Sequence, residues 1–144
     1  MVLKNASKIE QKTNVSMVIE KIYVRNLTKT RDINTAILPL TTDIHSIISN
    51  SEIDIICECM GGNAYLETKE YLKIAIRNKK HIIMSSKKTL ANFAQELLTI
   101  ANNENVHLKY DASVGGGIPI AKVLETAYQG EKIISQSCFL HILW

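Results

Sequence analysis

The chain has 144 residues, 46% hydrophobic and 22% charged, which fits one ordinary globular domain. The lysines and arginines are spread along the chain and leave a net charge of only +3, so no nucleic-acid partner is expected. No run approaches the roughly 20 apolar residues that span a bilayer, and the first ten residues lack the pattern of a signal peptide. A membrane partner is therefore not expected either.

Cysteine usage favours a reducing compartment. The chain has three cysteines, Cys57, Cys59 and Cys138, and their odd number does not suggest a disulfide framework. No pair of Cys-x-x-Cys spacings is present, so a zinc site is not expected. These features predict a cytoplasmic protein.

The first third of the chain contains short elements. Residues 1–13 have apolar side chains at helical spacing, which predicts a helix. Residues 17–25 are rich in β-branched side chains and predict a strand, and residues 36–40 predict a shorter one. Thr42 is expected to cap a short helix in which the isoleucines of residues 44–48 share one face.

The middle of the chain alternates strands with longer helices. Residues 53–59 form a nearly continuous apolar run, which is typical of a strand buried on both faces of a parallel sheet. Asn63 is expected to cap a helix that ends near Asn78. Residues 81–84 predict a second buried strand, and residues 106–110 predict a third.

One helix has the clearest pattern in the chain. Its apolar residues follow the i, i+3, i+4, i+7 spacing of a helix that packs on a sheet. They are Leu90, Phe93, Ala94, Leu97, Leu98 and Ala101. Strands that alternate with such helices predict right-handed βαβ units, hence an α/β fold with a doubly wound parallel sheet.

In sheets of this kind, ligands bind at the carboxyl ends of the strands. Gly61 and Gly62 follow one predicted strand there and would let a flat ligand lie on the backbone, although a plain strand-to-helix turn also explains them. Lys87 or Lys88 follows the next strand and would bind an anion or a carbonyl, unless it is merely solvated. Arg25 ends an earlier strand, where it would accept a 2′-phosphate.

A glycine-rich corner occupies residues 111–120, which read Asp-Ala-Ser-Val-Gly-Gly-Gly-Ile-Pro-Ile. It lies between the predicted strand at 106–110 and a predicted helix at 121–129, and Pro119 suits the first turn of that helix. A strand at 132–140 is expected to follow. The corner predicts exposed backbone dipoles beside an acid, although a tight turn for close packing explains the glycines equally well.

Four motifs together resemble those of homoserine dehydrogenases. Residues 111–120 are similar to the family's EASV-x-GGIPI, and residues 81–91 to its GKHVVTANKALLA. Residues 58–62 resemble VE-x-IGG, and residues 23–29 resemble VAVRDLSK. The motifs occur in the family's order, and the resemblance runs over nearly the whole chain.

The resemblance implies a reaction and its site residues. The family oxidises the small molecule L-homoserine to L-aspartate 4-semialdehyde with NADP or NAD, in threonine and methionine biosynthesis. The resemblance implies that Lys87 is catalytic and lies near the nicotinamide, and that Ser86 lies beside it at the cofactor. It further implies that Gly61 and Gly62 lie along the cofactor and that Arg25 lies near the adenosine ribose.

The resemblance also implies a Na⁺ site at the glycine corner. A carboxylate oxygen of Asp111 and the carbonyls of Val114, Gly116 and Ile118 would bind the ion, since hard oxygen ligands suit a hard cation. The family has Glu in place of Asp111, Asn in place of Ser86 and Asp in place of Asn26.

The ends of the chain depart further from the family. No G-x-G-x-x-G turn is present, and the sequence lacks the family's NGTTN stretch. We therefore expect a fragment: a partial, incomplete Rossmann-like NAD(P)-binding domain at 1–117 and the beginning of a catalytic domain at 118–144. We expect it to be inactive alone, while the full-length family member is expected to be a homo-oligomer.

Two other interpretations remain open. Another Rossmann-type oxidoreductase would also have a lysine after such a strand, although the GGGIPI corner argues against it. A non-catalytic remnant or assembly module would need no bound nucleotide, and the absence of the glycine turn from the sequence is consistent with that.

Overall fold

The computed structural model describes residues 2–31, 38–113 and 126. Its elements, in chain order, are α1 (Val2–Thr13), β1 (Ile22–Tyr23), β2 (Leu40–Thr41), α2 (His45–Ile48), β3 (Ile55–Glu58), α3 (Tyr65–Arg77), β4 (His81–Met84), α4 (Lys87–Glu104), β5 (Leu108–Lys109) and the 3-10 helix η2 (Asp111–Ser113). The predicted domain boundary at 117, the helix at 121–129 and the strand at 132–140 lie outside the described residues. None of the described helices has the length and apolar character of a membrane span.

All the strand pairs are parallel, as predicted. The strands β1 and β2 form one sheet, and β3, β4 and β5 form a second sheet in that order. In the second sheet Ile55 pairs with His81 and Glu58 with Met84, so the carboxyl ends of β3 and β4 are level. This βαβαβ arrangement confirms the α/β class and places two strand ends side by side.

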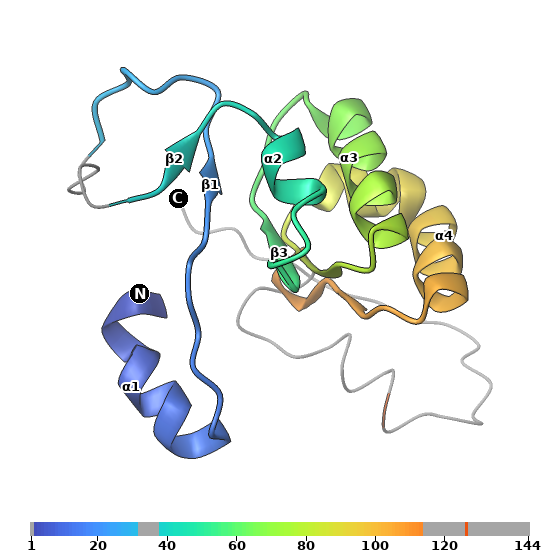
Figure 1. Ribbon diagram of the computed structural model, residues 1–144. Coiled ribbons are helices and arrows are strands. Elements are labelled where there is room, and N and C mark those ends of the chain that lie inside the picture. The colour runs from blue at the N-terminus through green and yellow to red at the C-terminus, as the bar shows by residue number, and fades with distance from the viewer. Residues whose placement is uncertain (1, 32–37, 114–125, 127–144) are drawn as a thin grey trace, which may run out of the picture.

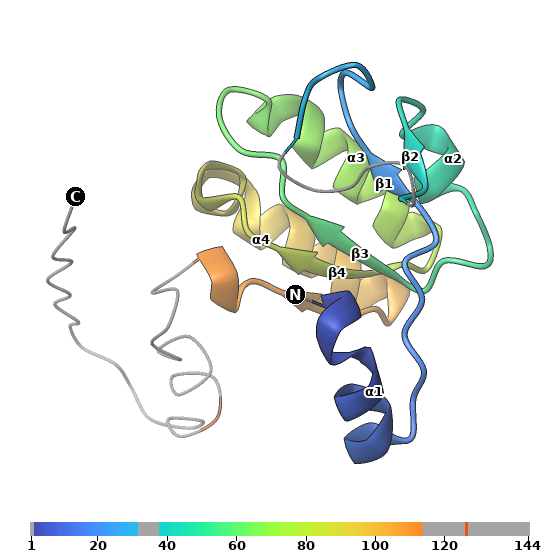
Figure 2. The ribbon, with the colours of Figure 1, turned by 90° about the vertical axis from the view of Figure 1, so that its left-hand side faces the viewer.

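The helices α3 and α4 lie next to each other on one face of the three-stranded sheet (Figures 1 and 2). Their apolar sides and the strand residues beneath them form one core, whose burial from water is the main stabilising contribution. The buried members of this core are Ile48, Leu72, Ala75, Ile76, Ile82, Met84, Leu90, Leu97, Ala101, Val106 and Leu108. The predicted apolar face of the helix that contains Leu90, Leu97 and Ala101 is thereby confirmed.

The prediction that the central strands are buried on both faces is wrong. Ile55 and Ile83 remain 49% and 44% exposed, whereas Ile82 and Met84, which point to the helices, are 1% and 0% exposed. Successive side chains of a strand point to opposite faces. Since α3 and α4 both cover the same face, the alternate residues of β3 and β4 stay open to solvent.

The first predicted strand is much shorter than expected. Only Ile22–Tyr23 of residues 17–25 pairs with another strand, and Met17 and Val18 are 44% and 80% exposed. β-branched composition allows an extended backbone, but a strand needs a partner, and β2 supplies one over two residues only.

Two of the predicted helix caps are also wrong. Asp43, not Thr42, provides the carboxylate that accepts from the His45 amide at 2.9 Å. Helix α3 begins after Ala64 with no side-chain cap, and Asn63 instead accepts from Lys88 Nζ at 3.4 Å. A polar residue near a helix start is therefore not always its cap: Asp43 reaches a free amide of α2, whereas the Asn63 side chain contacts Lys88 instead.

Candidate functional site

The candidate site lies where β3 and β4 end. Gly61 and Gly62 follow β3 by a few residues, and Ser86 and Lys87 follow β4. Because Glu58 and Met84 are partners in the parallel ladder, the two loops leave the sheet at the same edge. This is the edge at which open parallel sheets bind ligands.

Glu58 connects the two loops. Its side chain is only 5% exposed, and its two carboxylate oxygens accept from two different segments. Oε1 accepts from the Met60 amide at 2.5 Å, and Oε2 accepts from the Ser86 amide at 3.0 Å. The Glu58 carbonyl also accepts from the amide and the hydroxyl of Ser85, each at 3.0 Å. The loop after β3 and the loop after β4 are therefore held together by one residue.

The glycine pair presents open backbone. A Cβ placed at Gly61 or Gly62 would meet no heavy atom within 4 Å, so the space above both residues is free. Gly62 has a φ of +83°, which side chains disfavour, whereas Gly61 has no such conformation. A flat ligand therefore has room to approach the main chain at Gly61, as the sequence predicts.

Ser86 begins the longest helix of the described chain. Its hydroxyl accepts from the Thr89 amide at 3.4 Å and lies 2.8 Å from the Thr89 hydroxyl, and both residues are buried. This is a side-chain cap at the N-terminus of α4, where free amides and the helix dipole favour negative charge. Ser86 thus supports the site as a buried helix cap and not as an exposed contact residue.

The two neighbouring lysines differ in their contacts. Lys88 Nζ donates to Asn63 Oδ1 and lies 4.5 Å from the centre of the Tyr65 ring, so it ties α4 to the start of α3. Lys87 is exposed, and its side chain makes no hydrogen bond or ion pair within the described residues. Of the two lysines, Lys87 is therefore the one whose ammonium group has no partner among the described residues, and its catalytic role stays a prediction.

Arg25 stands on the other sheet. It is exposed and follows β1, which runs in the same direction as β3 in both views (Figures 1 and 2). The structure thus brings together Gly61, Gly62, Ser86 and Lys87 around Glu58, and leaves Arg25 at the end of a strand in a separate sheet.

The predicted cation site is described only at its first residue. Asp111 is exposed and opens the 3-10 helix η2, and Ser113 in that helix donates to the Met84 carbonyl at 2.8 Å. The end of β5 is thereby tied to the end of β4. Val114, Gly116 and Ile118, the other predicted ligands, lie outside the described residues, so the Na⁺ site stays a prediction.

Other chemistry finds little support in the described residues. No three His, Cys, Asp or Glu side chains there converge as a metal site would require. Desolvation, and then the neighbouring Cys59, raise the pKa of Cys57 above its ordinary value of 9.0. At neutral pH the thiol is therefore un-ionised and a poor nucleophile.

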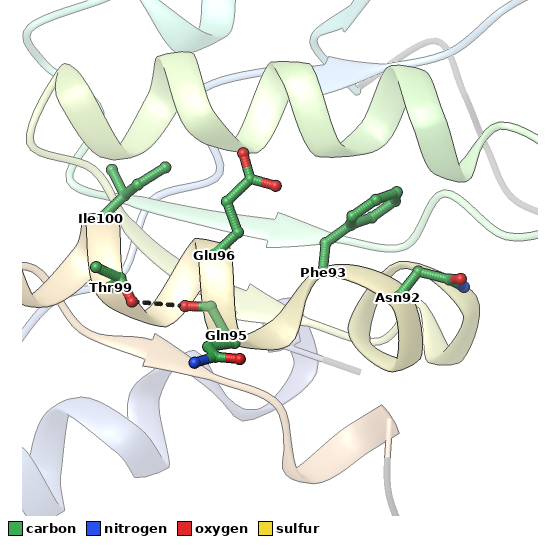
Figure 3. Close-up of a pocket in the computed structure, with 6 residues that line it drawn as sticks. All are labelled: Asn92, Phe93, Gln95, Glu96, Thr99 and Ile100. Carbon is green, nitrogen blue, oxygen red and sulfur yellow. Dashed lines mark hydrogen bonds between the residues drawn. The ribbon is translucent and has the colours of Figure 1, made fainter.

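An open hollow of about 470 Å³ lies along α4 (Figure 3). All the residues that line it come from α4, and Figure 3 shows Glu96 and Ile100 pointing towards α3 while Gln95 points away from it. Glu96 is already paired with Lys73 at 2.9 Å. The hollow therefore lies along one helix, and none of the residues that line it belongs to the candidate site.

Sequence reasoning missed two residues of this edge. Glu58 was part of a motif but had no role of its own, although an acid inside an apolar run is the signal that could have found it. Ser113 is buried and joins η2 to β4 over 29 residues of sequence, and nothing in its neighbours indicates that contact.

The chain resembles known proteins over most of its length. A family model described as "Homoserine dehydrogenase, NAD binding domain" matches residues 3–111. The homoserine dehydrogenase of Bacillus subtilis is 32% identical over 126 residues, which cover 88% of this chain and 29% of that protein. The homoserine dehydrogenase of Synechocystis is 38% identical over 118 residues, which cover 81% of this chain and 27% of that protein.

Solved structures agree. A homoserine dehydrogenase from Thiobacillus denitrificans superposes with a TM-score of 0.77 at 30% identity, over 89% of this chain and 29% of that one. A homoserine dehydrogenase from Staphylococcus aureus, whose crystal structure was solved at pH 7.5, superposes with a TM-score of 0.73 at 36% identity. The match covers 78% of this chain and 29% of that one. The chain thus spans less than a third of the length of the relatives that it matches.

Proposed function

Since this chain belongs to the homoserine dehydrogenase family, we propose that it forms the nucleotide-binding part of an enzyme that oxidises L-homoserine to L-aspartate 4-semialdehyde. This reaction would serve threonine and methionine biosynthesis. The whole enzyme would catalyse the reaction, and this chain would provide the residues that face the nucleotide.

One observation carries the proposal. The open backbone at Gly61 lies at the same sheet edge as the N-terminus of α4 and Lys87, whose side chain has no partner among the described residues, and the buried Glu58 joins the two loops. An anionic dinucleotide with flat rings suits such an edge, because glycine allows close approach and a helix N-terminus favours negative charge. When bound, its nicotinamide ring accepts the hydride that leaves the substrate carbon.

Each residue of the edge then has a role. Gly61 and Gly62 bind along the cofactor, and Ser86 fixes the first turn of α4 beside it. Lys87 Nζ would donate a hydrogen bond to the oxygen atom of the substrate alcohol and stabilise it as the carbon loses its hydride to the nicotinamide and the hydroxyl proton passes to water. The exposure of Lys87 and its lack of a described partner support this role.

The finer assignments are part of the same proposal. Arg25 would contact the adenosine ribose, where its guanidinium favours the 2′-phosphate of NADP, with NAD as the alternative. Asp111, exposed at the end of β5, would bind Na⁺ together with the carbonyls of Val114, Gly116 and Ile118. The whole enzyme would be a cytoplasmic homo-oligomer, and the free thiols of Cys57 and Cys59 suit a reducing compartment.

Substitution of Gly61 tests where the nucleotide lies. NADPH and NADH are titrated against the purified chain and against Gly61→Val, with the fluorescence of the reduced nicotinamide as the readout. We expect wild type to bind and Gly61→Val to bind at least about tenfold more weakly, because its side chain fills the space that the ligand needs. Thermal unfolding should change little, since a Cβ at Gly61 meets nothing within 4 Å.

Ser51→Val is the matched control, because it adds bulk in the exposed loop before the opposite end of β3. It should leave the affinity unchanged. Equal affinities for wild type and Gly61→Val would contradict the placement of the cofactor. A wild-type chain that binds neither nucleotide would refute nucleotide binding and favour a non-catalytic module.

A further inference from the structure

Glu58 has a side chain that the fold alone does not explain. It is 5% exposed and shares the helix-facing side of the sheet with Met84, which is 0% exposed. A carboxylate is costly to bury, and an apolar residue of similar size would pack there more cheaply. The structure therefore needs a reason for an acid at the end of β3.

We propose that Glu58 is a positioning residue, which fixes the Met60–Gly61–Gly62 loop relative to the Ser86–Lys87 loop by accepting one backbone amide from each. The inference rests on the proposed function in one respect: it identifies these loops as the nucleotide-facing ones. Glu58 itself does not touch the nucleotide in this proposal.

The hydrogen bonds assign this task to a carboxylate. The Met60 amide lies 2.5 Å from one oxygen and the Ser86 amide 3.0 Å from the other. Two donors converge on the side chain, so both of its ends must accept. An ionised carboxylate has two accepting oxygens, whereas an amide such as Gln has one acceptor and one donor. In Glu58→Gln, one of the two backbone amides would face an NH₂ group.

No side-chain cation of the described residues balances the charge. Within the described residues Glu58 has no ion pair, and the donors that reach its carboxylate are backbone amides. Ser86 is the N-cap of the 18-residue helix α4, so the carboxylate also lies at the positive end of the helix dipole. Charge-assisted hydrogen bonds of this kind are shorter and stronger than neutral ones.

The position of Lys87 follows from this bridge. Lys87 directly follows Ser86, and Gly61 directly follows Met60, so each ligand-facing residue lies one peptide from an amide that Glu58 holds. If the bridge is lost, the sheet remains paired through the β3–β4 ladder, but the two loops can move independently. Loss of the bridge should therefore weaken nucleotide binding more than it disturbs the core.

The test combines amide exchange with nucleotide titration on the full 144-residue chain. Hydrogen exchange at Met60 and Ser86 is measured by NMR in wild type and Glu58→Gln, and NADPH affinity is measured for both. We expect at least about tenfold faster exchange at one or both amides and at least about tenfold weaker NADPH binding in Glu58→Gln.

Two controls separate positioning from general loss of stability. Glu52→Gln makes the same chemical change at an exposed residue before β3 and should alter neither readout. Ile76→Val removes one methylene from a fully buried core position of α3 and should lower stability without altering the exchange pattern or the affinity. Glu58→Asp keeps the charge but is one methylene shorter, so it should restore one amide contact at most and bind NADPH only partly.

Unchanged exchange at both amides in Glu58→Gln would overturn the inference, whatever the nucleotide result. Faster exchange with unchanged NADPH affinity would also overturn it, because the Glu58 bridge would then not position the loops for nucleotide binding. If wild type binds no nucleotide, the proposed function fails, and exchange alone decides whether Glu58 holds the loops. If Glu58→Gln does not fold, wild type decides: Met60 and Ser86 should exchange more slowly than Gly61, for whose amide the structure describes no acceptor.

Discussion

Gly62 shows how one residue can be required by backbone geometry alone. Its φ of +83° lies in a region that residues with a Cβ disfavour, yet the space around it is open. Gly61, its neighbour, has equally open space and no positive φ. The pair therefore separates a conformational requirement for glycine from a requirement for room.

We expect Gly62→Ala to lower the free energy of unfolding by about 1–2 kcal/mol, because a left-handed backbone conformation costs this much for an L residue. Gly61→Ala should change it by less than about 0.5 kcal/mol, as for other exposed sites. Urea unfolding of both variants measures the difference. Equal losses would show that the loop does not hold Gly62 in this conformation.

At the scale of elements, a group of charged side chains connects α3 to α4. Lys73 Nζ lies 2.9 Å from Glu96 Oε1 across the two helices, and Lys69 Nζ lies 3.1 Å from Glu70 Oε1 within α3. The hydrogen bond from Lys73 chiefly lowers the pKa of Glu96 below its ordinary 4.5, and that from Lys69 chiefly lowers the pKa of Glu70. The hydrogen bond to Glu96 raises the pKa of Lys73 above 10.5.

These shifts set the sign of the pH dependence. A carboxylate with a lowered pKa contributes stability that is present above pH 4.5 and is lost as the pH falls through the folded-state pKa. Lys73 contributes stability that is present below pH 10.5 and is lost as the pH rises through its raised pKa. The contacts between α3 and α4 should therefore have their full ionic contribution in the neutral range.

We expect Glu96→Gln to be slightly less stable than wild type at neutral pH and to converge with it below pH 4.5, where Glu96 becomes protonated. The difference should also shrink in concentrated salt, since these groups face solvent. Urea unfolding across pH gives the result. Glu67→Gln, an exposed change in α3 with no described ion pair, is the control, and a constant difference down to acid pH would contradict the assignment.

At the scale of the whole molecule, one face of the three-stranded sheet is packed and the other is open. The open face presents Ile55 and Ile83, and β3 and β1 each stand at the edge of their own sheet. Exposed apolar faces and unpaired edges promote association between chains.

We expect Ile83→Thr to reduce self-association with little change in stability, because the side chain is 44% exposed and threonine keeps the β-branched shape. The same substitution at Ile82, which is 1% exposed on the packed face, should instead cost about 2–4 kcal/mol. Light scattering over a concentration series and urea unfolding measure the two effects. Undiminished association of Ile83→Thr would mean that the chains do not associate through this face of the sheet.

The sequence by itself determined the class of fold and the sheet edge where the candidate site lies. Helical spacing from Leu90 to Ala101 and short apolar runs before glycine and serine are local patterns, and the parallel α/β units follow from their order. Gly61, Gly62, Ser86 and Lys87 could be placed at strand ends for the same reason, while Val114, Gly116 and Ile118 stay predictions.

Only the tertiary structure decided how those strand ends are joined and which strand face is buried. Glu58 and the Ser86 amide are 28 residues apart, so no local pattern relates them. Likewise, the exposure of Ile55 and Ile83 depends on α3 and α4 packing on the same face, a choice that an apolar run does not reveal. Periodicity describes neighbours along the chain, whereas burial and hydrogen bonding across strands depend on segments that meet only when the chain folds.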